Sequence, residues 1–206
     1  HKKMYQLCWK AAKEEHKKGE HTQGKKKEEH KEKHKKDSHH GPHWSYEGAR
    51  GPLHWGEAFP ECGLGKSQSP LDVQGPFEKA SDALRISYKI SPLKILNNGH
   101  TIQVNYAPGS SVTIGKETYE LLQFHFHRPS EEKIDGRSKA MVAHFVHKSK
   151  EGKLAVIGVL LDFGDENELV KTLWENLPKE EGEESVVENV TIDAAQLLPQ
   201  KLGYYH

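Results

Sequence analysis

Two histidines spaced by one residue stand in a strictly alternating segment of this 206-residue chain. The segment, residues 123–127, reads Gln-Phe-His-Phe-His. Because neighbouring side chains of a β-strand point to opposite faces, His125 and His127 share one face and the two phenylalanines share the other. Two imidazoles placed in this way can reach one metal ion, and imidazole is the commonest metal ligand. The spacing therefore predicts two ligands of a metal site, with a pair of ordinary strand histidines as the alternative.

A third ligand is expected from a neighbouring strand. Residues 140–147 follow a turn-rich connection, and in them His144 is in phase with Val142 and Val146, whereas His147 points to the opposite face. Parity alone leaves either histidine as the third ligand. Three neutral imidazoles with one open position form a catalytic zinc arrangement rather than a structural one. Such an ion lowers the pKa of its bound water to about 7, so the chemistry indicated is attack by a metal-activated hydroxide.

The segments that must position these histidines are mostly of β type. They are rich in β-branched and aromatic residues and are separated by turn residues such as Asn98-Gly99 and Asp135-Gly136. Residues 165–176 instead place leucines at helical spacing. The sequence therefore predicts a mainly β fold around one sheet. The expected strands are residues 84–90, 100–106, 111–114, 120–126, 140–147 and 154–163.

The first part of the chain differs in composition from the rest. Residues 1–43 hold 13 lysines and 7 acidic residues, so a basic segment precedes an acidic body although the formal net charge is zero. We assign residues 1–42 as a low-complexity tail, disordered on composition, and residues 43–206 as one globular domain. Two alternatives stay open for the tail. It could bind an acidic surface or nucleic acid, or its histidines could capture divalent ions.

Several classes of protein receive no support from the composition. No apolar run approaches the length of a membrane span. The segment from His1 to Cys8 lacks the apolar stretch of an intact signal peptide. Cys8 and Cys62 could pair, but two cysteines alone do not establish a disulfide.

The histidines lie within longer motifs. Residues 122–131 read Leu-Gln-Phe-His-Phe-His-Arg-Pro-Ser-Glu, and residues 143–147 read Ala-His-Phe-Val-His. Both resemble the zinc-strand signature of α-class carbonic anhydrases, particularly the bacterial ones. Further matching motifs follow in the order of the family, so that the resemblance covers about residues 43–206. These motifs are residues 43–46, 51–55, 68–72, 96–100 and 154–158.

The resemblance implies a fold and a reaction. The fold is a large twisted, mostly antiparallel central sheet with a few short peripheral helices, and one Zn²⁺ lies at the bottom of a conical cleft. The family pattern selects His144 over His147 as the third ligand beside His125 and His127. The reaction is the reversible hydration of carbon dioxide to bicarbonate and a proton, by zinc-hydroxide attack.

Further positions match residues with known roles in the family. His100 matches a proton shuttle, a role that suits imidazole because it titrates near neutrality, although from the residues alone it reads as an exposed turn histidine. Glu131 matches the active-site carboxylate, and Gln123 matches a residue that orients the first zinc histidine through its free ring nitrogen. Two valines match the apolar wall beside carbon dioxide, although without the resemblance they would be assigned to the sheet core. Three further residues match positions that organise cleft water. The valines are Val146 and Val156, and the three water-organising positions are Tyr46, Asn97 and Asn98.

The resemblance also bears on partners and location. It implies a periplasmic or secreted lyase whose partner is a small-molecule substrate, carbon dioxide or bicarbonate. We expect no nucleic-acid partner and no membrane span. The oligomeric state stays open, with a dimer as one option.

Three departures from the family pattern bear on the chemistry. Val142 stands where the family has a Glu that accepts the ring N–H of His144, so we expect this N–H to lack its usual carboxylate, at a cost of about 10–100-fold in metal affinity or activity. Glu132 replaces a structural His, and a buried carboxylate is costly unless it is paired. The family pattern also continues past Tyr204 into a Ser-Leu-Thr-Thr-Pro-Pro-Cys segment that this sequence does not contain. We therefore expect zinc binding with impaired turnover. The alternative function is a non-catalytic, carbonic anhydrase-related zinc-binding or structural module.

Overall fold

The computed structural model describes residues 44–46, 48–66, 69–76, 84–182, 184–200 and 203–204. The chain divides into two compact units, His1–Ser69 and Pro70–His206, and each is described by itself. The predicted tail and Cys8 lie outside the described residues. The predictions of a disordered tail, of one domain over residues 43–206 and of a Cys8–Cys62 pair therefore stay predictions.

The described part of the first unit holds four short helical turns and a cluster of three aromatic rings. The ring of Trp44 contacts those of Tyr46 and Trp55 edge to face, each at a centroid distance of 5.4 Å. The indole Nε1 of Trp55 also donates a hydrogen bond to the carbonyl of Ser45 at 3.0 Å. The helical turns are η1 (Gly48–Arg50), η2 (Pro52–His54), α2 (Trp55–Ala58) and α3 (Pro60–Leu64).

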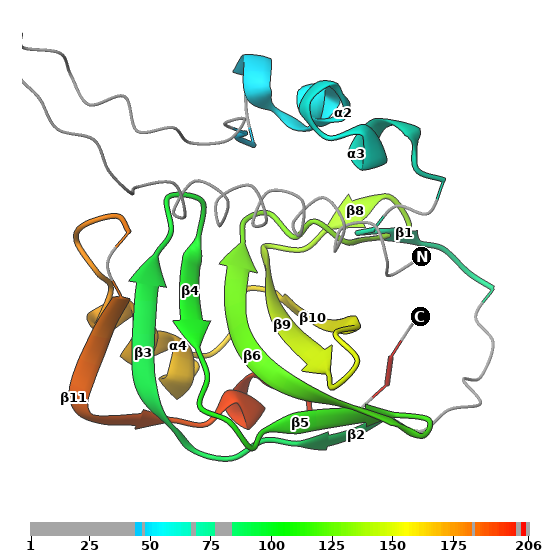
Figure 1. Ribbon diagram of the computed structural model, residues 1–206. Coiled ribbons are helices and arrows are strands. Elements are labelled where there is room, and N and C mark those ends of the chain that lie inside the picture. Colours follow the sequence, from blue (N-terminus) through cyan, green and yellow to red (C-terminus); the bar gives the residue numbers. More distant parts are fainter. Residues whose placement is uncertain are drawn as a thin grey trace, which may run out of the picture. The chain divides into compact units, whose positions relative to one another are not determined.

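The second unit is built on an eight-stranded sheet that curves strongly along its longest strand, β6 (Figure 1). Its main path runs β10-β9-β6-β4-β3-β11, while β5 pairs with β6 and β2 pairs with β5. Each of these pairings is antiparallel. The strands are β2 (Leu84–Ser87), β3 (Ser91–Asn97), β4 (Ile102–Asn105), β5 (Ser111–Ile114), β6 (Glu117–His127), β9 (Met141–Ser149), β10 (Leu154–Leu161) and β11 (Glu184–Ile192).

A smaller sheet of three short strands accompanies it. Strand β1 (Asp72–Val73) pairs in parallel with β7 (Lys133–Ile134), which pairs antiparallel with β8 (Arg137–Ser138). A 3-10 turn, η3 (Ala194–Leu197), follows β11. The predicted mainly β fold, with an antiparallel sheet and few short helices, is confirmed.

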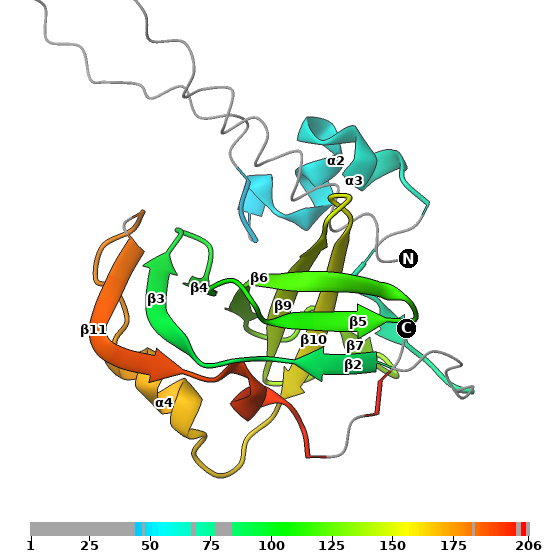
Figure 2. The same cartoon turned by 60° about the horizontal axis from the view of Figure 1, so that its bottom comes forward.

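Helix α4 (Glu168–Glu175) packs against one face of the large sheet, near β3 and β11 (Figure 2). The side chain of Asn167 caps the helix by accepting a hydrogen bond from the N–H of Val170 at 3.1 Å. Leu169 and Leu173, four residues apart, are buried against the sheet because they lie on one side of the helix. The phenylalanines of the Gln-Phe-His-Phe-His segment belong to this core, as predicted from their parity. The core residues of the sheet include Leu93, Ile95, Val104, Leu121, Phe124, Phe126 and Phe145.

Strand β6 carries one extra residue where it pairs with β9. Leu121 lies opposite His147, but Gln123 already lies opposite Val146, so that Leu122 has no counterpart in β9. A bulge of this kind bends the strand. It also lets Leu121 face the core together with Phe124, although these residues are three apart in the sequence. The segment after the bulge then alternates regularly and presents its histidines to the opposite face.

No helix in the described part of the chain is both long and apolar enough to cross a membrane.

Candidate metal centre

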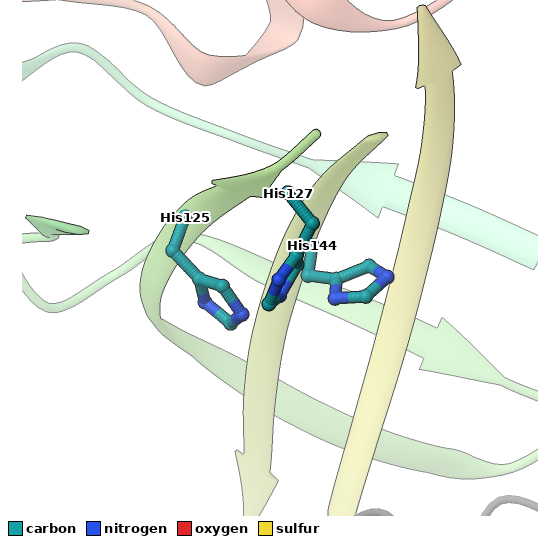
Figure 3. Close-up of side chains that lie close together, drawn as sticks. All are labelled: His125, His127 and His144. Carbon is teal, nitrogen blue, oxygen red and sulfur yellow. The ribbon is translucent and has the colours of Figure 1, made fainter. Parts of the chain in front are cut away.

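Three imidazoles come together on the face of the sheet opposite the phenylalanine core. His125 and His127 come from β6, and His144 comes from β9, directly opposite His125 in the register. Their candidate ligand atoms all lie within 4.8 Å of one another, and all three side chains are buried. Figure 3 shows the three rings gathered on one side of the two strands. The group could therefore hold one metal ion.

The alternative third ligand, His147, lies on the other face. Its Nε2 is hydrogen-bonded to the hydroxyl of Tyr88 at 2.9 Å, and its Nδ1 donates to the carbonyl of Ala155 at 3.2 Å. Its ring also stacks on that of Tyr88, at a centroid distance of 5.9 Å. His147 is therefore a core histidine with its polar atoms used, and the choice that parity left open falls to His144.

In two of the three histidines, His125 and His144, one ring nitrogen is hydrogen-bonded to a neighbouring side chain. The N–H at Nδ1 of His125 donates to Oε1 of Gln123 at 2.9 Å, which leaves Nε2 for a metal. The N–H at Nε2 of His144 donates to Oε1 of Glu132 at 2.7 Å, which leaves Nδ1 for a metal. Partners of this kind fix both the tautomer and the orientation of a ligand ring.

The expectation that the ring N–H of His144 lacks a carboxylate partner is wrong. Val142 is fully buried and apolar, as read from the sequence, but Glu132 reaches the same ring nitrogen from the loop that follows β6. Its side chain is 23% exposed and His144 is 1% exposed. The carboxylate of Glu132, which would be costly to bury without a partner, is thus paired with His144. Burial alone would raise the pKa of Glu132, but the hydrogen bond and the charge of His144 outweigh it and lower the pKa.

The remaining carboxylate, Glu131, lies next to the metal-facing edges of two rings. Its Oε2 is 3.3 Å from Nε2 of His127 and 3.7 Å from Nδ1 of His144. Burial, and then the charge of His144, lower the pKa of His127 to about 3. His127 is therefore neutral at pH 7, which is the form that binds a metal.

The predicted apolar wall lies on the same face. Val146 and Val156 are opposite one another in the β9–β10 register, and the next same-face pair is His144 with Gly158. Because cross-strand partners share a face, both valines lie beside the histidines rather than in the phenylalanine core.

The turn between β3 and β4 carries the other predicted residues. His100 is exposed there. The side-chain oxygen of Asn97 accepts from the N–H of Gly99 at 3.0 Å, and that of Asn98 accepts from His100 and Thr101 at 3.1 and 2.9 Å. Gly99 has a φ of +82°, a conformation that favours glycine. Both asparagines thus hold the turn. Tyr46 belongs to the first unit and is described there alone.

We expect His147 to make the free energy of unfolding depend on pH. Burial lowers its pKa from 6.5 to about 4 in the folded protein, so between these values the unfolded chain binds more protons. The contribution of His147 to stability is complete above about pH 6.5 and is lost, by about 3 kcal/mol, as the pH drops to about 4. Denaturant unfolding of metal-free protein at pH 7 and pH 4.5 measures this loss. The loss should be smaller in His147→Phe, and equal losses in the two proteins would refute the assignment.

Comparison with known proteins gives a consistent family. The model of the eukaryotic-type carbonic anhydrase family matches residues 50–206. A carbonic anhydrase of Nostoc sp. is 39% identical over 171 residues, covering 79% of this chain and 65% of that protein. The chain thus spans about two thirds of the length of this relative.

Solved structures agree in fold. An α-carbonic anhydrase of Photobacterium profundum superposes with a TM-score of 0.72 at 37% identity, covering 77% of this chain and 73% of that one. The enzyme of Thermovibrio ammonificans, solved in complex with the inhibitor sulfanilamide, gives 0.72 at 38% identity, with 77% and 72% covered. The chain therefore belongs to the α-class, eukaryotic-type carbonic anhydrase family.

Proposed function

We propose that the chain catalyses the zinc-dependent, reversible hydration of carbon dioxide to bicarbonate and a proton. The observation that carries the proposal is the convergence of three buried imidazoles, each supplied by a sheet strand, on one face. Zinc fits this donor set, because it favours nitrogen ligands and a three-histidine site leaves a fourth position for the reaction. The ion, when bound, supplies a water-derived nucleophile at neutral pH.

The chain's own residues then have distinct tasks. Gln123 holds the ring of His125 through its second nitrogen. Val146 and Val156 offer carbon dioxide, an apolar molecule, an apolar surface beside the histidines. Glu131 is placed to accept a hydrogen bond at the site. We assign Asn97, Asn98 and Tyr46 to the organisation of cleft water on the family resemblance.

Metal analysis with a hydration assay tests the function. We expect one zinc per chain, loss of hydration on treatment with a chelator, and recovery on addition of zinc. Sulfanilamide should inhibit the zinc-loaded protein, since it is the inhibitor bound in the Thermovibrio relative. A zinc-loaded protein with no hydration above the buffer rate would instead identify a non-catalytic zinc-binding member of the family.

His100 is proposed as the proton shuttle. It is exposed on the β3–β4 turn, where an imidazole can pass a proton to buffer. We expect His100→Ala to lower kcat in weak buffer while kcat/KM for carbon dioxide changes little, and small imidazole buffers to restore part of the loss. Full turnover of the variant in weak buffer would exclude this role.

We also propose a periplasmic or secreted location, on the resemblance to bacterial α-carbonic anhydrases. Fractionation of the natural host followed by immunodetection would test it, and recovery in the cytoplasmic fraction would contradict it.

A further inference from the structure

The strongest feature that the reaction scheme leaves unexplained is the placement of Glu132. It lies on the loop after β6, twelve residues before His144 in the sequence, yet its Oε1 is 2.7 Å from Nε2 of His144. The partner of His125, in contrast, is Gln123, which lies two residues away on the same face of the same strand. On β9 the equivalent position, two residues before His144, is Val142, which has no polar group.

The loop is built so that the backbone of Glu132 is held in place. The hydroxyl of Ser130 donates to the carbonyl of Glu132 at 2.6 Å and accepts from the N–H of Lys139 at 2.8 Å. The N–H of Ser130 donates to the carbonyl of Lys139 at 3.0 Å. Ser130 is 3% exposed, so these bonds are sheltered from water and tie the loop to the chain segment that enters β9.

The neighbouring strand leaves room for the carboxylate. Gly158 of β10 lies opposite His144 in the register. A Cβ at this position would approach Oε1 of Glu132 to 3.1 Å, its Cδ to 3.4 Å and Cδ2 of His144 to 3.5 Å. A glycine inside a strand weakens the strand, and a close approach of another group is one of the usual reasons for it. The space over Gly158 is thus occupied by the pair of Glu132 and His144.

We propose that Glu132 is the residue that positions His144 for the metal, replacing from the loop a carboxylate that would otherwise stand at position 142. By accepting the proton at Nε2 it presents Nδ1 to the ion, holds the ring plane, and makes the imidazole a more basic ligand. This inference rests on the proposed zinc site. It changes the expectation from the sequence, since the Val142 departure no longer implies a weakened metal centre.

Zinc competition titrations on the full chain test the proposal. Removing such a partner typically weakens metal binding by about 10–100-fold, and we expect a loss of this size for Glu132→Ala. Glu132→Gln should lose less, because its amide oxygen still accepts the hydrogen bond. The matched control is Glu166→Ala, which removes an exposed ion pair with Lys171 and should leave zinc affinity unchanged.

Two further variants test whether the loss of zinc affinity depends on the geometry of the Glu132–His144 pair. Glu132→Ala combined with Val142→Glu should regain most of the affinity, because the new carboxylate would stand two residues from His144, as Gln123 stands from His125. Gly158→Ala should displace the carboxylate and weaken zinc binding in the wild-type background. In the Glu132→Ala background it should have almost no effect, since contacting residues are not additive.

A spectroscopic signal separates positioning from a general structural role. In zinc-loaded protein, proton NMR should show a slowly exchanging ring proton at Nε2 of His144, and Glu132→Ala should lose it while keeping the far-ultraviolet circular dichroism of the fold. An unchanged zinc affinity together with a retained ring proton in Glu132→Ala would overturn the inference. Absence of zinc binding by the wild-type chain would instead overturn the proposed function.

Discussion

Replacing His125 with alanine is expected to weaken zinc binding by more than about 100-fold and to abolish hydration. A structural zinc site with four ligands is worth about 10–16 kcal/mol, so one ligand contributes about 3 kcal/mol, which corresponds to a factor of about 100. The variant also leaves the amide of Gln123 without the ring to which it is hydrogen-bonded. Affinity is measured by competition with a chromophoric chelator, and activity by the carbon dioxide hydration rate at saturating zinc.

A control must remove a buried histidine from the same sheet without touching the site. His147→Phe does so, because His147 is fully buried on the opposite face and bonded to Tyr88 and Ala155. We expect this variant to lose stability but to keep its zinc affinity. If it lost as much zinc affinity as His125→Ala, the assignment of the two histidines to different faces would be wrong.

Replacing Phe145 with alanine is expected to lower the free energy of unfolding by about 3–5 kcal/mol. The ring is fully buried and stacked between Phe124, at 5.3 Å, and Tyr88, at 5.8 Å. Removal leaves a cavity that this stack cannot readily fill. Typical domains have a total of about 5–15 kcal/mol, so the loss is a large share of the stability. Denaturant unfolding at saturating zinc measures it.

The matched control is Phe163→Ala, since Phe163 is 92% exposed and its ring has little contact to lose. Its effect should stay within about 0.5 kcal/mol. If Phe145→Ala lowered the free energy of unfolding by less than about 1 kcal/mol, the neighbouring rings would have repacked into the cavity.

The segments that the sequence identified best are β5 and the two strands that carry the histidines. Residues 111–114 were predicted with the observed bounds of β5, and the histidine strands were predicted within a few residues of β6 and β9. These strands pack aromatic or β-branched side chains on one face, so their alternation is strong. The first predicted strand, 84–90, ends earlier, at Ser87. The helix is shorter than the predicted 165–176, because Asn167 caps it.

Two strands of the large sheet were not predicted, for two different reasons. Strand β3 begins Ser91-Pro92, and proline within a run counts against a strand. Here the proline lies near the start of the strand, before the segment that pairs with β4. Strand β11 is mostly exposed, and its apolar residues do not alternate regularly with polar ones. Both are held by pairing with partners distant in the sequence, which local patterns do not reveal.

The residues of the candidate site that lie on strands were predictable from the sequence, but the role of the residue on a loop was not. Parity gave the shared face of His125 and His127, and the family resemblance gave His144. The role of Glu132 could not be read, because it depends on how the loop after β6 folds back over β10. The sequence did hold one signal for it. The family carboxylate is absent at position 142, and a carboxylate appears instead at position 132.

The bulge at Leu122 has a consequence for how β6 tolerates changes of length. Loss of any other single residue between Leu121 and His127 would invert the side chains on one side of the deletion, sending either histidines into the core or phenylalanines into the site. Loss of Leu122 alone would leave Leu121 followed by Gln123, a regular alternation in which every remaining side chain keeps its face. The deletion would give up the hydrogen bond that the carbonyl of Leu122 accepts from the N–H of Tyr106 at 2.9 Å. The Leu121-Leu122 pair, in which loss of either leucine gives the same sequence, is therefore where β6 can shorten by one residue and keep both its core and its three imidazoles.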